Sequence, residues 1–278
     1  MCRLLGVVSR SSRSLPQAVP AELPLFTALS ERHKDGWGVA WYGDAPGART
    51  PLVLRATDTA LASNSYGEAV EAAHGEVMTV HLRRASVGLA LELRNTHPFV
   101  HGEVSFSHNG QFDLSEELRE RILARGGRRP EGTTDSELFF SLVTAWAAED
   151  AARGAGDLDG LSGVAWARAV QRAAAELTGW TLELFGRVPE SLNCLLTTPD
   201  ALVAFAAHDP AQAPTDQPPE VYELRYRVED VRVLVSSTGY PQEGFATLAQ
   251  GGAIAVARGT LEVTQLAPLY APEAVAPR

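Results

Sequence analysis

Four short stretches of the chain hold residue types that could carry out one reaction together. The first is Cys2, in the opening MCRLLG. A methionine followed by a small residue is a suitable substrate for methionine removal, which would leave Cys2 with a free α-amine. An α-amine has a pKa of about 7.7–8.0, so it can take the thiol proton near neutral pH and generate the reactive thiolate. Cys2 is therefore a candidate nucleophile, although a cysteine at this position can also be incidental.

Two further stretches supply groups that bind anions. VHLRRAS places Arg83 and Arg84 at the end of an apolar run, and arginine is the side chain that holds a carboxylate in a bidentate manner. In SHNGQF, the side-chain amide of Asn109 and the backbone N–H of Gly110 could both donate to a developing oxyanion. Taken alone, these stretches also fit a salt bridge at the end of a strand and a hairpin turn.

The fourth stretch, TTDSE, carries Asp135 in the expected first turn of a helix. A carboxylate is favourable there in any protein, but it could also receive the ammonium of a ligand. Together the four stretches describe one molecule. Arginine would bind an α-carboxylate, Asp135 an α-ammonium, and the thiolate with its oxyanion hole would attack a side-chain amide. Glutamine has all three features.

The elements expected to position these residues are strands, then helices, then strands again. Alternating or apolar runs predict strands at 4–9, 36–44, 51–56, 76–86 and 103–113, helices over 113–124, 134–149 and 161–180, a hairpin over 192–207, and strands at 221–227, 231–237, 252–259 and 261–268. Capping-box patterns place two helix starts at Asp113 with Glu116 and at Thr134 with Glu137. This order favours two sheets with helices packed outside them.

The ordered set MC…LLG, DGWG, HLRRAS, NTHPF, SHNG and TDSE resembles the class II glutamine amidotransferases of the N-terminal nucleophile hydrolase superfamily. The resemblance implies an α+β fold, a four-layer αββα sandwich of two mainly antiparallel sheets. It implies a single domain over residues 2–267, with a motif-rich part at 2–150 and a less readable part at 151–267. Residues 268–278 are then expected to be a loose tail, and the proline-rich 209–220 an exposed loop.

The resemblance also implies roles for individual residues. Cys2 would form a γ-glutamyl thioester, Asn109 and Gly110 would form the oxyanion hole, Arg83 would bind the substrate carboxylate and Asp135 its ammonium. Arg84 is the poorer carboxylate ligand, because alternation along a strand should point it to the opposite face. A last group is expected to shape the pocket near the nucleophile: Gly36, Trp37 and Gly38.

The histidines raise the possibility of a metal site, since five of them lie within one part of the sequence: His33, His81, His97, His101 and His108. The resemblance calls for no metal or other cofactor, because the α-amine already supplies the base. We therefore expect structural or pocket-lining histidines. Cys194 lies in an apolar run, so it is expected to be a packed thiol and not a second nucleophile.

Composition excludes several classes of partner. The net charge of −10 argues against binding to a nucleic-acid backbone, and the short basic run at 121–129 is expected to be a solvated loop. The longest apolar runs are too short to span a bilayer, and the opening residues do not have the pattern of a signal peptide. A cytoplasmic protein acting on a small molecule is expected.

Three functions remain open at this point. The chain could be a stand-alone hydrolase of glutamine or another γ-glutamyl compound, similar to the γ-glutamyl hydrolase of ergothioneine biosynthesis. It could be the ammonia-supplying subunit of a two-protein synthase. A non-catalytic glutamine-binding module is the remote alternative, and the intact set of Cys2, Arg83, Asn109, Gly110 and Asp135 argues against it.

Overall fold

The structure is a computed structural model that describes residues 2–269 except 46, 87, 155 and 216. Its strands form two antiparallel sheets within the described residues. Sheet A has the spatial order β11 (Ala246–Thr247), β9 (Leu224–Val228), β10 (Arg232–Ser237), β1 (Arg3–Ser14), β4 (His74–Leu82), β2 (Trp37–Trp41) and β3 (Leu52–Ala56). Sheet B has the order β13 (Val263–Leu266), β12 (Ala253–Ala257), β8 (Ala201–Phe205), β7 (Ser191–Thr198), β6 (Val104–Gln111) and β5 (Phe99–His101).

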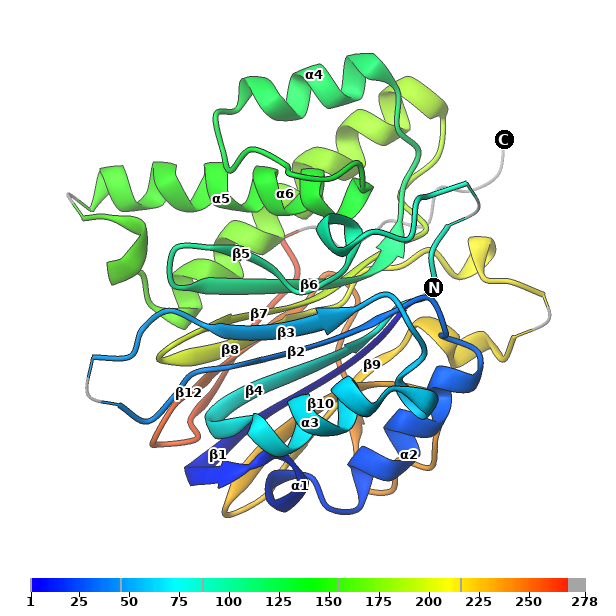
Figure 1. Cartoon of the computed structure of the whole chain (residues 1–278). Coiled ribbons are helices and arrows are strands. Elements are labelled where there is room, and N and C mark those ends of the chain that lie inside the picture. The colour runs from blue at the N-terminus through cyan, green and yellow to red at the C-terminus, as the bar shows by residue number, and fades with distance from the viewer. Residues whose placement is uncertain (1, 46, 87, 155, 216, 270–278) are drawn as a thin grey trace.

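Helices cover the outer face of each sheet (Figure 1). On sheet A lie α1 (Leu15–Ala18), α2 (Glu22–Ala28) and α3 (Asn64–Ala72), and on sheet B lie α4 (Glu116–Ala124), α5 (Asp135–Arg153) and α6 (Gly163–Phe185). Short 3-10 turns connect them: η1 (Leu29–Glu31), η2 (Ala60–Ala62), η3 (Leu93–Asn95), η4 (Leu158–Gly160), η5 (Pro210–Gln212) and η6 (Pro219–Tyr222). The α+β four-layer αββα sandwich expected from the sequence is confirmed.

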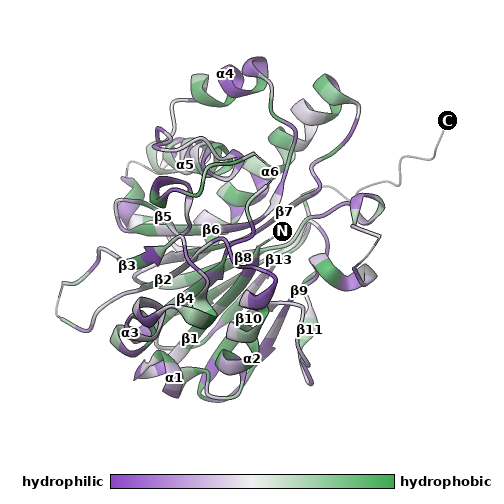
Figure 2. Cartoon of the chain, turned by 45° about the vertical axis from the view of Figure 1, so that its right-hand side comes forward, coloured by the Kyte–Doolittle hydropathy of each residue, from purple (hydrophilic) through white to green (hydrophobic). Residues whose placement is uncertain are grey.

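Three apolar cores hold the layers together. Alternate residues along a strand point to opposite faces of its sheet, so one strand contributes to two of these cores. Along β1, Leu5 and Val7 pack toward the helices, whereas Leu4 and Val8 pack between the two sheets. Figure 2 shows hydrophobic residues along strands of both sheets and both hydrophilic and hydrophobic residues on α4. Gly6 faces sheet B, where an added Cβ would lie 2.6 Å from Leu202 Cδ1. The missing side chain therefore allows the two sheets to approach closely beside the start of β1.

The expected strands and the 192–207 hairpin are present, but four expectations need correction. The basic run at 121–129 is not a solvated loop, because its first residues belong to α4 and Arg128 is buried. Helix α4 begins after Ser115, whose Oγ accepts from the backbone N of Leu118, while Asp113 pairs with Arg187 instead of capping the helix. The strand expected at 221–227 is β9, which begins at Leu224 because the preceding residues form η6. Helices α1–α3 were not expected, so the order is not simply strands, helices and strands.

The boundary of the expected tail falls at the limit of the described chain. Pro268 and Leu269 follow β13 without regular structure, and residues 270–278 lie outside the described residues. Within residues 209–220, the described positions are mostly exposed or half-buried and include η5. None of the helices that the structure describes is both long and apolar enough to cross a membrane.

Candidate active site

Cys2 lies immediately before β1, at the edge where strands of both sheets end. In β1, Arg3 pairs with Leu82, the last residue of β4. The backbone N of Cys2 donates to Asn109 Oδ1 of sheet B at 2.8 Å, and its Sγ lies 3.7 Å from the backbone O of Arg84. The residue is 8% exposed. The thiol is therefore held between the two sheets with a small opening to solvent.

Asn109 and Gly110 occupy the end of β6, where they pair with β7. Asn109 is fully buried, and its Nδ2 lies 3.5 Å from Ser237 Oγ. At Gly110, an added Cβ would lie 1.8 Å from the backbone O of Ser191, so a larger residue cannot occupy this position without moving β7. The structure thus brings the expected oxyanion-hole residues to the backbone of Cys2.

Arg83 and Arg84 follow β4 and point in different directions, as alternation predicts. Arg83 is 2% exposed, and its guanidinium donates to the backbone O of Asp35 at 3.4 Å and of Ala90 at 3.2 Å. Burial lowers the pKa of Arg83, while the neighbouring Cys2 and Asp35 act in the opposite direction. Arg84 is exposed. Of these two arginines, Arg83 is therefore the buried one.

Asp135 begins α5, and Thr134 caps the helix by accepting from the backbone N of Glu137 at 3.1 Å. The carboxylate of Asp135 accepts from the backbone N of Phe112 at 3.1 Å and of Ser136 at 2.8 Å. These two donors fix the orientation of the carboxylate. Because Phe112 follows β6 directly, its hydrogen bond ties Asp135 to the end of that strand.

The half-buried Asp135 lines a cavity of about 300 Å³ between the end of β6, the start of α5 and the segment after Arg84. The other lining residues are Ser86, Gly88, Leu89, Gln111, Phe112 and Thr134. Ser86 Oγ donates to Gln111 Oε1 at 2.9 Å and so links the two walls. Cys2 and Arg83 do not line this cavity, so the structure brings Asp135 to the same edge of the sandwich and not into contact with the thiol.

The three residues expected to shape the pocket have different surroundings. Gly36 has a φ of 140°, which favours glycine, and its backbone O accepts from the backbone N of Arg83 at 2.8 Å. At Gly38, an added Cβ would lie 2.1 Å from the backbone O of His97. Trp37 pairs with Leu82 and belongs to the core beneath α1–α3, with its Nε1 donating to Asp58 Oδ1 at 2.9 Å. Its indole therefore supports sheet A from behind and does not face the sulfur of Cys2.

The histidines pack in the interior beside this site. The rings of His81 and His97 lie 4.3 Å apart, and His97 also contacts Phe99. His108 joins β6 to α5, because its Nδ1 lies 2.9 Å from Ser136 Oγ. Burial lowers the pKa of His81 to about 3 and holds the pKa values of His97 and His108 below their ordinary value. Within the described residues, no group of three or more potential ligands is placed to hold a metal ion.

Cys194 has a different environment from Cys2. It lies on β7 in the core under α4–α6, is fully buried, and burial raises the pKa of its thiol. Thiolate is the reactive form of cysteine, so this environment disfavours Cys194 as a nucleophile.

Two residues at the site were not predicted from the sequence. Asp35 accepts from the backbone N of Ala85 through Oδ2 at 2.9 Å and from Arg83 through its backbone O, so it holds the segment after β4. Ser237, at the end of β10, contacts Asn109 and accepts from the backbone N of Leu4 at 3.1 Å. The position of Asp35 directly before the GWG segment is a sequence signal that could have identified it. No local sequence pattern identifies Ser237, because its partners lie far away in the sequence.

Comparison with known proteins is consistent with this geometry. The family described as Glutamine amidotransferases class-II matches residues 1–252. The chain is 26% identical over 153 residues to the gamma-glutamyl-hercynylcysteine sulfoxide hydrolase of Mycobacterium tuberculosis, a match that covers 52% of this chain and 61% of that protein. It is 35% identical over 129 residues to the glutamine–fructose-6-phosphate aminotransferase (isomerizing) of Aliivibrio fischeri, covering 45% of this chain and 19% of that protein. The chain therefore spans less than two thirds of the length of either relative.

A solved structure shares the fold along almost the whole chain. A glutamine aminotransferase class-II domain protein from Silicibacter pomeroyi superposes with a TM-score of 0.61 at 19% identity, covering 96% of this chain and 100% of that one. At this identity the likeness shows the fold alone. The family match, however, extends over most of the sequence and includes every residue of the site described above. The chain belongs to the class II glutamine amidotransferases.

Proposed function

We propose that the protein is an amidohydrolase that attacks the side-chain amide of glutamine, or of another γ-glutamyl compound, with the thiolate of Cys2. The observation that carries the proposal is the hydrogen bond from the backbone N of Cys2 to Asn109 Oδ1 at 2.8 Å. After removal of Met1, that nitrogen would be the α-amine. Asn109 would hold the amine in place, so that its lone pair can accept the proton of the Cys2 thiol.

In the proposed first step, the thiolate attacks the γ-carbonyl carbon and a tetrahedral oxyanion forms. The Asn109 side-chain amide and the Gly110 backbone N–H donate to that oxyanion. The C–N bond then breaks, and the ammonium of Cys2 gives its proton to the departing nitrogen. The products of this step are a γ-glutamyl thioester and ammonia or an amine.

In the second step, water attacks the thioester carbon and the same α-amine accepts a proton from the water. The C–S bond breaks and glutamate leaves. Arg83 would hold the α-carboxylate of the substrate throughout, because it is a buried cation beside Cys2. Asp135 would bind the α-ammonium, since its carboxylate faces the adjoining cavity. Fixing both charged groups on the α-carbon orients the γ-carbonyl toward the sulfur.

A γ-glutamyl hydrolase in an ergothioneine-type pathway is the second candidate, supported by the relative from M. tuberculosis. An ammonia-supplying subunit of a two-protein synthase would use the same glutaminase chemistry. In that case a partner protein would consume the ammonia. A binding module that never turns glutamine over is the remaining alternative.

The test is glutamate release from glutamine and from a panel of γ-glutamyl compounds, with the intact mass of the protein checked for loss of Met1. Cys2→Ala should lower turnover by at least about a thousandfold, because no other group can form the thioester. Cys194→Ala is the matched control and should stay within about twofold of the wild type. Iodoacetamide should modify Cys2 and leave the fully buried Cys194 untouched in the folded protein.

Each outcome selects one function. Glutamate release without a partner supports the stand-alone hydrolase, and release only after a synthase is added supports the subunit. Binding of glutamine without turnover supports the binding module. Full activity of Cys2→Ala in a protein that has lost Met1 would contradict the proposed mechanism.

A further inference from the structure

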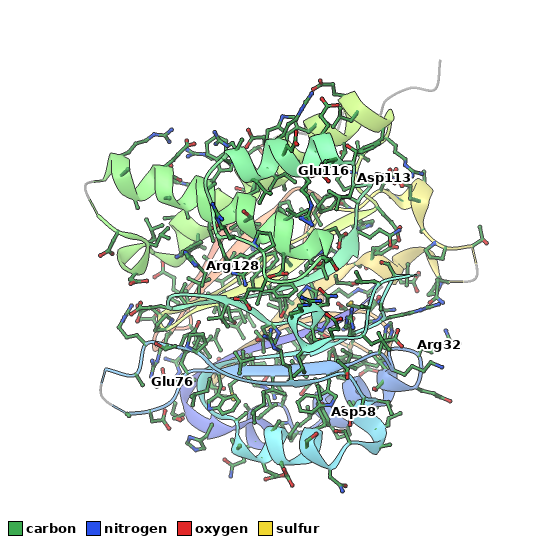
Figure 3. The ribbon with its side chains drawn as sticks, turned by 45° about the horizontal axis from the view of Figure 1, so that its top comes forward. Arg32, Asp58, Glu76, Asp113, Glu116 and Arg128 are labelled. Carbon is green, nitrogen blue, oxygen red and sulfur yellow. The ribbon has the colours of Figure 1, made fainter. Side chains whose placement is uncertain are left out.

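The two ends of the site carry opposite charge, although the chain as a whole has a net charge of −10. Asp135 begins α5, on the outer side of sheet B. At the same edge of the sandwich, but on the outer side of sheet A, lie three arginines: Arg3, Arg32 and Arg84. Figure 3 shows Arg32 in the lower layers and Asp113 in the upper layers, both on the side of the molecule where β1 begins.

Arg3 lies directly beneath the nucleophile. Its Nη1 donates to the backbone O of Cys2 at 3.1 Å, and the residue is 4% exposed. Because Arg3 pairs with Leu82 in the sheet, its side chain lies on the face of sheet A that α1–α3 cover. A cation in this position adds positive potential at the opening above Cys2, and burial limits the screening of that potential by salt.

Arg32 follows η1, which approaches Gly239 as Arg3 does. An added Cβ at Gly239 would lie 3.1 Å from Leu29 Cδ2 and 3.5 Å from Arg3 Nε. The backbone N of Arg32 donates to the backbone O of Leu29 at 3.1 Å, so Arg32 is held to η1 near Gly239. Its side chain is exposed.

Arg84, the third arginine, lies next to Cys2 through its backbone. Its backbone O is 3.7 Å from Cys2 Sγ, and its side chain is exposed. The positive charges of Arg84 and Arg32 are near enough to repel that of Arg3. Burial lowers the pKa of Arg3 to about 10, and this repulsion contributes to the lowering, while Cys2 acts in the opposite direction. Asp35, the acidic residue on the intervening turn, uses Oδ2 to accept from the backbone N of Ala85.

The opposite end of the site is acidic. Glu190 precedes β7, and its backbone N donates to the backbone O of Gln111 at 3.0 Å. Burial raises the pKa of Glu190, the charge of Asp135 raises it further, and Arg187, which pairs with Asp113, acts in the opposite direction. The α-ammonium of a γ-glutamyl group would match the carboxylates at this end, where Arg83 would hold the α-carboxylate, and an anion on the leaving group would match the arginines at the other end. Glutamine supplies the α-ammonium, but the amine that it releases is neutral ammonia.

We propose that the substrate's leaving amine carries a negative charge, as in a γ-glutamyl amino acid, and that Arg32 and Arg84 bind this charge. Arg3 adds to the attraction from its buried position. The inference rests on the proposed function and narrows it to a class of substrate. The reaction is hydrolysis of the amide through the Cys2 thioester, and the amino acid leaves with its carboxylate unchanged.

The experiment compares γ-glutamylglycine with γ-glutamylglycinamide. The two substrates have nearly the same size and differ by one negative charge on the leaving group. Glycinamide is intrinsically the better leaving amine, so a preference for γ-glutamylglycine reports recognition of the charge. We expect kcat/KM to favour γ-glutamylglycine by about tenfold or more at low ionic strength. The ratio should shrink in about 1 M salt, where the Debye length is about 3 Å.

Variants assign the preference to residues. Arg32→Gln and Arg84→Gln should each lower the kcat/KM ratio severalfold, and the double variant should bring it close to one. Arg13→Gln is the matched control, because Arg13 is an exposed arginine at the far end of β1, and it should leave the ratio unchanged. Equal thermal midpoints of the variants confirm that the change in ratio is not caused by unfolding.

The two proposals fail in different ways. Hydrolysis of both substrates with a ratio of one or less in the wild type would overturn the inference about the leaving group and leave the proposed function standing. A ratio that stays high in the double variant would overturn the assignment to Arg32 and Arg84. No hydrolysis of any γ-glutamyl compound, glutamine included, would overturn the proposed function and this inference with it.

Discussion

The backbone N of Cys2 donates to Asn109 Oδ1 at 2.8 Å, and this hydrogen bond joins the first strand of sheet A to β6 of sheet B. The two residues are 107 positions apart in the sequence. The same amide of Asn109 offers Nδ2, which lies near Ser237 Oγ. One side chain can therefore hold the nitrogen of Cys2 with its oxygen and, in the proposed mechanism, donate to a substrate oxyanion with its nitrogen.

Asn109→Asp separates these two roles. The carboxylate keeps an acceptor for the nitrogen of Cys2 but removes the oxyanion donor. We expect kcat to fall by about 10²–10³ with a small change in KM, because the donor acts on charge that develops only in the transition state. Steady-state kinetics of glutamate release would check this. Asn64→Asp, at the exposed start of α3, is the control and should retain wild-type kinetics. An increase in KM alone would contradict an oxyanion role.

Gly38 and Gly67 should respond to alanine in opposite ways. At Gly38 an added Cβ would lie 2.1 Å from the backbone O of His97, so Gly38→Ala must displace the chain that follows and should destabilise the fold by several kcal/mol. At Gly67, exposed within α3, an added Cβ meets nothing within 4 Å. Gly67→Ala should raise the free energy of unfolding by about 0.5–1 kcal/mol through helix propensity. Urea denaturation measures both, and a neutral Gly38→Ala would show that the close approach is not required.

A buried ion pair holds the segment that leads to Asp135. Arg128 Nη1 lies 2.7 Å from Glu137 Oε1, and the side chain of Glu137 has no exposure. Glu137 also accepts from the backbone N of Gly132 at 2.6 Å. Arg128→Met should lower the free energy of unfolding by about 3–5 kcal/mol, because it leaves a buried carboxylate without its cation. Adding Glu137→Gln should recover part of that loss, since the double variant buries no unpaired charge.

The control for this pair is exposed. Arg153 contacts Asp150 and Glu149 on the surface of α5, and Arg153→Ala should change the free energy of unfolding by less than about 1 kcal/mol. Equal effects of Arg128→Met and Arg153→Ala in chemical denaturation would contradict the importance of burial.

The buried histidines make the fold sensitive to acid. Burial lowers the pKa of His81 to about 3 and lowers those of His97 and His108, so the folded chain binds fewer protons than the unfolded chain below about pH 6.5. Their contribution to stability is therefore complete above that pH and is lost as the pH falls toward 3. Each histidine should contribute a slope of up to about 1.4 kcal/mol per pH unit in this window.

Unfolding free energies measured between pH 7 and pH 4 would check this slope. His97→Phe removes one titrating group and should make the slope shallower. Phe99→Leu is the control, because Phe99 packs against the His97 ring and does not titrate, so it should lower stability equally at every pH. The same slope in His97→Phe and the wild type would show that His97 does not contribute.

Much of the fold was predictable because its signals are local. An apolar run indicated β1, a roughly alternating pattern indicated β4, and Thr134 with Glu137 marked the start of α5. Helices α1–α3 were missed because they are short, and prolines and a glycine interrupt their pattern. The false helix start at Asp113 has a nonlocal cause, since its partner Arg187 lies 74 residues away.

The candidate site was predictable as a set of motifs and less so as a geometry. Alternation separated buried Arg83 from exposed Arg84. The motif alone did not place Trp37, whose position beneath α1–α3 depends on its pairing with Leu82 in β4. Ser237 could not be found from the sequence, because only the pairing of β10 with β1 brings it to Asn109.

That pairing also sets the order in which the site can be assembled during synthesis. β1 is synthesised well before one of its two neighbours, because β10 begins at Arg232. One edge of β1 therefore stays unpaired until residues 232–237 have been made. Pairing of β10 with β1 then brings Ser237 to Asn109 and completes the surroundings of Cys2.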